Sequence, residues 1–215
     1  STILGFSDVL TKDWKNFDEA TKQTFIKSIS LASLSTYRLV ENLLMWSRTQ
    51  TGGLVFNPEN IDMGNVVLEA VKAVSSMAEN KQIHIVNAIP YNTTLVADEN
   101  MLQTVLRNLL NNAIKFSHRA GVVEVGASFS ADCCEVWVAD QGIGIDPEDA
   151  ARRFKIDQSI KRNGTLNETG SGLGLLLCYE LISRHRGKIW VESEPDKGSR
   201  FAFSIPLDIQ KTKKE

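Results

Sequence analysis

The sequence predicts an α+β protein in which a helical hairpin precedes a two-layer α/β sandwich. Three observations support this fold class. Apolar residues alternate four and three positions apart between residues 25 and 46, later stretches switch between helical and strand periodicity, and the expected strands favour antiparallel pairing. Helices and strands that are segregated in this way pack as one layer of helices on one sheet.

Size and composition exclude few functions. The chain has 215 residues, of which 42% are hydrophobic and 23% charged, as in an ordinary globular protein. Its net charge of −2 gives no reason to expect nucleic acid or an acidic membrane surface as a partner. The apolar runs are too short to span a membrane or to form a signal peptide. The three cysteines lack the spacing of a zinc site or a disulfide framework, so we expect small buried side chains and a reducing compartment.

Residues 1–52 are expected to form an incomplete helical dimerisation domain. A first helix ends near Leu10, a break follows at residues 16–18, and the carboxylate of Asp18 can cap the long second helix. The apolar seam of that helix has the spacing of packed helix pairs. Two helices of this size cannot bury the seam alone, so we expect two chains to associate as a four-helix bundle. The seam consists of Phe25, Ile29, Ala32, Thr36, Leu39, Leu43 and Trp46.

The second domain is expected at residues 53–209, followed by a polar tail at 210–215. The boundary is placed there because Thr51-Gly52-Gly53 ends the long helix and Asn57-Pro58 marks a turn. The expected helices of this domain are 61–80, 98–116 and 173–186, and the expected strands are 82–86, 122–129, 135–139, 188–193 and 200–206.

The helix expected at 98–116 carries polar residues on one face. Asn108, Asn112 and Lys115 lie four and three positions apart and share that face. An amide oxygen is a hard, neutral ligand that suits Mg²⁺, which keeps several waters and phosphate oxygens of a substrate. The lysine one turn on can meet phosphate as a point charge. A solvated helix face is the alternative, and the stacked amides beside a lysine on an otherwise apolar helix argue against it.

A second group of residues follows the strand expected at 135–139. Asp140 stands at the strand end, where its carboxylate can accept a hydrogen bond from an exocyclic amine such as that of adenine. Gly142 and Gly144 allow a ligand to approach the backbone closely. Taken alone, this pattern is also that of an ordinary glycine-containing turn.

A third group, Gly170-Ser171-Gly172-Leu173-Gly174-Leu175, opens the last helix. Glycines at a helix start leave backbone N–H groups and the positive end of the helix dipole available to an anion. A dinucleotide-binding fold does not fit, because no strand directly precedes these glycines and no acidic residue follows at the required distance. The polar stretch 146–169 before them is expected to be a mobile lid or disordered. The three groups together indicate a purine nucleoside triphosphate with its metal.

In this order, the motifs resemble the catalytic ATP-binding domain of sensor histidine kinases, in the wider group that includes gyrase-type ATPases, Hsp90 and MutL. Residues 108–116 are similar to the family's N box, 140–144 to its G1 box and 170–175 to its G2 box. Phe154 resembles the F box, although Asp157 stands where a second aromatic residue is often found. The segments 187–193 and 198–206 are similar to the family's last two strands.

The resemblance implies that ATP and Mg²⁺ are the cofactors. Asn108 and Asn112 would hold the metal, Asp140 would bind adenine, and Lys115 would neutralise phosphate charge. Asn108 and Lys115 would also take part in catalysis. The remaining nucleotide-binding positions would be Gly142, Gly144, Phe154, Gly170, Ser171, Gly172, Leu173, Gly174 and Leu175.

Asn108 separates two subgroups of this wider group. The hydrolysing relatives carry a glutamate one turn before the metal-binding asparagine, and this glutamate activates water. An amide cannot take that proton, so the resemblance implies transfer of the γ-phosphoryl group to another acceptor. The acceptor would be a histidine, and an aspartate in the receiver domain of a response regulator would take the group next. A cytoplasmic homodimer without membrane contact by this chain is expected.

The acceptor histidine itself is expected to be absent from this sequence. In the family it lies in a box with an acidic residue and a proline, and residues 1–10 resemble the stretch that follows this box. None of His84, His118 and His185 has such neighbours. Two alternatives stay open: an ATP-hydrolysing relative, against which Asn108 argues, and a degenerate module that binds partners, against which the glycines and Asp140 argue.

Overall fold

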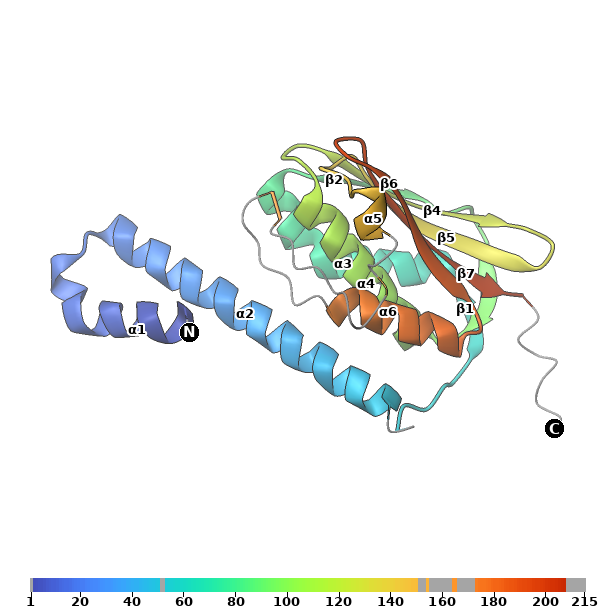
Figure 1. Ribbon diagram of the computed structural model, residues 1–215, viewed down its shortest axis with the longest axis horizontal. Coiled ribbons are helices and arrows are strands. Elements are labelled where there is room, and N and C mark those ends of the chain that lie inside the picture. Colours follow the sequence, from blue (N-terminus) through green and yellow to red (C-terminus); the bar gives the residue numbers. More distant parts are fainter. Residues whose placement is uncertain (1, 51–52, 151–153, 155–163, 166–172, 208–215) are drawn as a thin grey trace. The chain divides into compact units, whose positions relative to one another are not determined.

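The computed structural model describes residues 2–50, 53–150, 154, 164–165 and 173–207. The chain divides into two compact units, residues 1–47 and 48–215. The first contains a helical hairpin and the second a layer of helices on a sheet, so the predicted fold class is confirmed (Figure 1).

The helical unit is a hairpin whose turn is held by aromatic rings. Helix α1 (Thr2–Asp13) leads through a 3₁₀ turn, η1 (Trp14–Asn16), into α2 (Glu19–Gln50). The predicted cap is present, because Oδ1 of Asp18 accepts a hydrogen bond from the backbone N–H of Thr21 at 2.9 Å. The ring of Phe25 lies 5.2 Å from that of Phe6 and 5.3 Å from that of Phe17, which joins the two helices across the turn.

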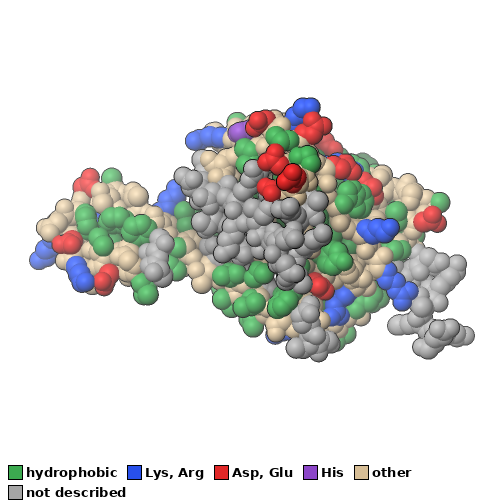
Figure 2. Space-filling view, viewed as in Figure 1, with side chains coloured by type: hydrophobic (Ala, Val, Ile, Leu, Met, Phe, Trp, Pro, Cys, Tyr) green, Lys and Arg blue, Asp and Glu red, His purple; other side chains and the backbone are tan. Residues whose placement is uncertain are grey.

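Helix α2 presents many large apolar side chains to solvent in the single chain. Leu39 and Leu43 of the predicted seam are 38% and 48% exposed. Figure 2 shows hydrophobic side chains gathered on the surface of the helical unit. An exposed stripe of this kind is typical of a surface that association buries, and the dimer itself stays a prediction. Among the described helices, none combines the length and the apolar character needed to cross a bilayer.

The second unit contains a five-stranded sheet in the order β2-β4-β5-β7-β6. The β2–β4 pair is parallel and the other pairs are antiparallel, as the expected antiparallel preference requires. A separate antiparallel pair, β1 with β3, lies outside this sheet. The strands are β1 (Glu59–Asp62), β2 (His84–Ala88), β3 (Thr94–Ala97), β4 (Val122–Phe129), β5 (Cys133–Asp140), β6 (Lys188–Glu194) and β7 (Gly198–Pro206).

Three helices, α3 (Met63–Lys81), α4 (Glu99–Phe116) and α6 (Leu173–Arg184), cover one face of the sheet (Figure 1). Helix α4 packs between α3 and α6 and against β5. Its apolar face lies in the core, where Leu102, Leu106, Leu109 and Leu110 are fully buried. Burial of this stripe leaves the polar side of α4 available for a site.

Two helix boundaries differ by two residues from the sequence-based expectation. Helix α3 begins at Met63 instead of residue 61, because residues 61 and 62 pair with β3 and Oδ1 of Asp62 accepts the N–H of Gly64 at 2.7 Å. Helix α6 ends at Arg184 instead of residue 186, because Arg186 adopts a left-handed φ of 58°. The short elements β1, β3 and α5 (Pro147–Ala150) were not expected at all.

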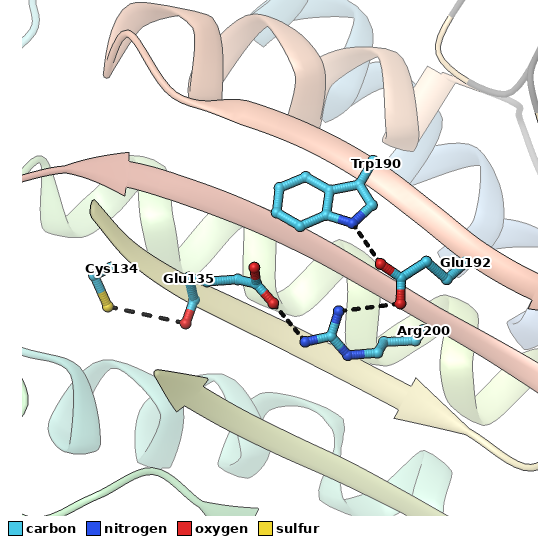
Figure 3. Close-up of polar contacts among 5 residues, drawn as sticks. All are labelled: Cys134, Glu135, Trp190, Glu192 and Arg200. Atoms are coloured by element: carbon cyan, nitrogen blue, oxygen red, sulfur yellow. Dashed lines mark hydrogen bonds and ion pairs between the residues drawn. The ribbon is translucent and has the colours of Figure 1, made fainter. Parts of the chain in front are cut away.

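Charged and aromatic side chains cover part of the sheet face that carries no helices (Figure 3). The guanidinium group of Arg200 on β7 pairs with Glu135 on β5 and with Glu192 on β6. It also lies 4.7 Å from the ring centroid of Trp137, and the indole N–H of Trp190 donates to Glu192 at 3.0 Å. These contacts join three adjacent strands.

Asp98 and His185 fix the start of α4. Oδ1 of Asp98 accepts the N–H of Met101 and Oδ2 accepts the N–H of Asn57, both at 3.0 Å. The N–H of Asp98 donates to Nε2 of His185 at 3.0 Å, so Nδ1 carries the proton and donates to the carbonyl of Leu181 at 2.8 Å. Burial lowers the pKa of His185, which favours this neutral ring.

We expect Asp98→Ala to lower the free energy of unfolding by about 1–3 kcal/mol, because it removes a helix cap and leaves a partly buried N–H of Asn57 without its acceptor. Urea denaturation measures this change. Asp62→Ala is the matched control, since Asp62 caps α3 at a less buried position. Equal losses in the two variants would contradict the role of the Asn57 contact.

Candidate functional site

The polar face of α4 meets the first turn of α6. Nδ2 of Asn108 donates to the carbonyl of Thr104 at 2.9 Å, which orients the amide. Oδ1 of Asn108 consequently faces Gly174, where a Cβ atom would lie only 2.8 Å from this oxygen. The absence of a side chain at Gly174 therefore allows the start of α6 to approach α4. Asn112 and Lys115 follow on α4, both half-buried.

The turn after β5 lies against the last turn of α4. The N–H of Ile143 donates to the carbonyl of Phe116 at 3.2 Å. A Cβ atom on Gly142 would collide with that same carbonyl, so only glycine fits here. Gly144 adopts a φ of +64°, in the left-handed region. The first and second sequence groups are thus brought together at one end of α4.

The same turn is also bound to the connection between β6 and β7. The N–H of Asp196 donates to the carbonyl of Ile143, and the N–H of Ile145 donates to Oγ of Ser193, each at 2.9 Å. Oγ of Ser193 in turn donates to the carbonyl of Gly198 at 2.7 Å. These bonds hold the turn against the connection between β6 and β7.

Asp140 is a buried carboxylate at the end of β5, with 7% of its surface exposed. Desolvation raises the pKa of its carboxyl group to about 6, against the effect of hydrogen bonds from the backbone of Gly142 and Ser199. The N–H of Gly142 lies 2.9 Å from Oδ1. A buried carboxyl group with a strongly perturbed pKa is typical of a functional site, where a ligand can supply the hydrogen bonds that solvent no longer provides.

The third sequence group is only partly described. Gly170, Ser171 and Gly172 lie outside the described residues, whereas Leu173, Gly174 and Leu175 form the first turn of α6. The N-terminal end of this 12-residue helix is a favourable position for an anion. Phe154 is described, and its ring lies 6.5 Å from that of Phe201 on β7 at an interplanar angle of 76°. Asp157 also lies outside the described residues.

The residues of α4 fit a magnesium ion bound with phosphate. Amide oxygens and phosphate oxygens are hard ligands of the kind that Mg²⁺ prefers. Next to the two predicted ligands, Oδ1 of Asn111 is buried and has no hydrogen-bond partner among the described residues. An unpaired buried oxygen costs about 1–3 kcal/mol, and a water of the ion's hydration shell would supply the missing donor.

Several residues of this site were missed by the sequence-based analysis. Asn111 and Ser193 lie in segments that resemble the family but were given no role, and Thr165 belongs to no motif. Thr165 donates through Oγ1 to the carbonyl of Ser117 at 2.8 Å. Only Asn111 could have been found from the sequence, because its amide lies beside the two amides that were predicted to bind the metal.

This fold and site define a nucleotide-binding domain with an α/β sandwich. Residues 97–209 match the family of histidine kinase-, DNA gyrase B- and HSP90-like ATPases, and the chain belongs to this family. Among its relatives, the sensor-like histidine kinase SenX3 of Mycobacterium tuberculosis (strain ATCC 25618 / H37Rv) is 31% identical over 193 residues, which are 90% of this chain and 47% of the relative. The chain therefore spans about half the length of this curated relative.

Solved structures of similar fold include two kinases in complexes. Full-length ShkA in complex with AMPPNP superposes with a TM-score of 0.71 at 26% identity, over 96% of this chain and 42% of that chain. Histidine kinase ThkA in complex with the response regulator protein TrrA has a TM-score of 0.75 at 21% identity, over 96% of this chain and 58% of that chain, which shows the shared fold.

We expect Asp140→Asn to raise the free energy of unfolding at pH 8 by up to about 3 kcal/mol. The folded pKa is about 6 and the unfolded value 3.8, so the carboxyl group favours folding fully only below pH 3.8. This contribution to stability is lost as the pH rises through 6. The asparagine side chain of the variant does not ionise, so the variant does not lose stability in this way.

Chemical denaturation at intervals between pH 4 and pH 8 measures the effect, with Asp132→Asn, an exposed carboxylate in the turn before β5, as the control. Stability curves of Asp140→Asn and wild type that run parallel across this range would contradict the buried, perturbed carboxyl group.

Proposed function

We propose that this chain is the ATP-binding catalytic region of a sensor histidine kinase, which transfers the γ-phosphoryl group of ATP to a histidine. The observation that carries this proposal is the position of Asp140. Its buried carboxylate ends β5 beside a glycine turn that is itself bonded to α4. A hydrogen-bond acceptor with a high desolvation cost, next to amides and a lysine, suits adenine at one end and phosphates at the other.

The proposed roles rest on the chemistry of each side chain and on the contacts described above. Asp140 accepts a hydrogen bond from the adenine amine, and Gly142 and Gly144 let the nucleotide approach the backbone. Lys115 and the N–H groups at the start of α6, including the G2 glycines, neutralise phosphate charge. Asn108 and Asn112 hold Mg²⁺, which when bound neutralises charge on the phosphates. Phe154, whose ring contacts that of Phe201, is proposed to cover the nucleotide.

Catalysis by these residues rests on positioning and electrostatics. Asn108 cannot act as a general base, so the site holds ATP without activating water efficiently. Its amide is already engaged with Thr104 and faces Gly174, which supports a positioning role. We therefore expect the γ-phosphoryl group to be transferred to an imidazole acceptor and not to water.

The acceptor histidine is proposed to be none of the three in this sequence. His84 and His118 are exposed on the ATP-binding unit, at the start of β2 and just after α4, and His185 is buried behind the start of α4. We further propose that α1 and α2 form a homodimer through their exposed apolar stripe, with residues 1–52 as dimerisation domain and 53–209 as ATP-binding domain. A response regulator aspartate would receive the phosphoryl group in the cytoplasm.

Incubation with γ-labelled ATP and Mg²⁺ tests this function. We expect the wild-type chain to release phosphate no faster than Asp140→Asn, because the site lacks a general base. We also expect no acid-labile label on the wild-type chain. We also expect label on an added chain that includes the acceptor helix, followed by transfer to a receiver domain. Multiple turnovers without an acceptor would instead identify an ATP-hydrolysing relative, and label on His84, His118 or His185 would overturn the acceptor assignment.

A further inference from the structure

Lys81, at the end of α3, is a buried cation outside the motifs. Only 3% of the surface of Lys81 is exposed. Nζ donates to the carbonyl of Ile114 at 2.9 Å and to the carbonyl of Lys115 at 2.7 Å. These are two of the last carbonyl groups of α4, which have no partner within their own helix and carry the negative end of its dipole.

The carbonyl groups around the end of α4 all have partners from other parts of the site. That of Lys115 accepts from the N–H of Thr165 at 3.2 Å as well as from Lys81. Those of Phe116 and Ser117 accept from Ile143 and from Thr165. Helix α3, the turn after β5 and the segment at residues 164–165 therefore converge on four consecutive carbonyl groups.

The backbone of Lys81 adds to this connection. Its carbonyl accepts the N–H of Ala120 at 3.1 Å, and Nε of Arg119 donates to Oε1 of Gln82 at 2.9 Å. The end of α3 is thus bonded both to the last turn of α4 and to the loop that follows it. The position of Lys115 depends on this arrangement, because its own carbonyl is one of the atoms that Lys81 binds.

We propose that Lys81 is a positioning residue for the triphosphate end of the nucleotide. Its ammonium group fixes the last turn of α4, and thereby the place from which the side chain of Lys115 meets the phosphates. Lys81 does not touch the nucleotide in this account. The inference rests on the proposed nucleotide site and adds the residue that holds its phosphate half in position.

The substitution Lys81→Met tests this role, because methionine keeps a long apolar side chain and removes the donors. We expect the Kd for MgATP to rise about tenfold or more, as is common when a supporting partner of a binding residue is removed. The Kd for adenosine, which depends on Asp140 on β5, is expected to change less than about threefold. Lys81→Arg, which restores a cation with several donors, is expected to recover most of the MgATP affinity.

Two comparisons separate positioning from loss of stability. Val74→Ala, at a buried site on α3 that is 2% exposed, lowers stability without touching α4's last carbonyl groups and is expected to leave the ratio of the two Kd values unchanged. In a double-mutant cycle that combines Lys81→Met with Thr165→Val, the effects on MgATP binding are expected to be non-additive. The reason is that both side chains bond to the carbonyl of Lys115.

Each result bears on the inference in a defined way. Unchanged MgATP affinity in Lys81→Met, or equal weakening of MgATP and adenosine as in a merely destabilised chain, overturns the positioning role and leaves the nucleotide site standing. Absence of MgATP binding in the wild type overturns the proposed function, and this inference with it.

Discussion

The last turn of α4 imposes the constraint on which the rest of the site depends. A helix buried at its C-terminal end leaves carbonyl groups that must find donors elsewhere. Here the donors come from α3 through Lys81, from the turn after β5 through Ile143, and from Thr165. Pairing these groups places the turn proposed to bind adenine and the helix face proposed to bind phosphate at a fixed distance. The geometry of the site is therefore a consequence of satisfying a helix terminus.

The start of α4 is also fixed by hydrogen bonds, so the helix cannot easily shift along its axis. Asp98 caps it, and the N–H of Asp98 binds a neutral His185 that lies at the end of α6. Apolar packing between these ends buries the leucines of α4 completely. Asp140 shows the opposite relation to stability, because its burial opposes ionisation. A buried carboxyl group that weakens the fold at neutral pH is typical of functional sites.

The sequence predicted what local patterns encode. The strand at 122–129 was predicted to the residue, and α4 to within one residue, because alternation and a broad apolar stripe are strong signals. The four-residue strands β1 and β3 were missed, since so few residues show no period. Lys81 bonds to carbonyl groups 33 and 34 residues away, and no local pattern reports such a contact. A lysine at the end of an amphipathic helix is expected in solvent.

The site residues remain predictions that one measurement tests most directly. Calorimetric titration of MgATP into the wild-type chain and into Asp140→Asn compares binding with and without the carboxylate. The account predicts saturable binding to the wild type and none to the variant, which is expected to be folded and more stable than the wild type at pH 8. Equal binding to both proteins, or none to the wild type at millimolar MgATP, would contradict the claim that Asp140 forms the adenine end of a nucleotide site.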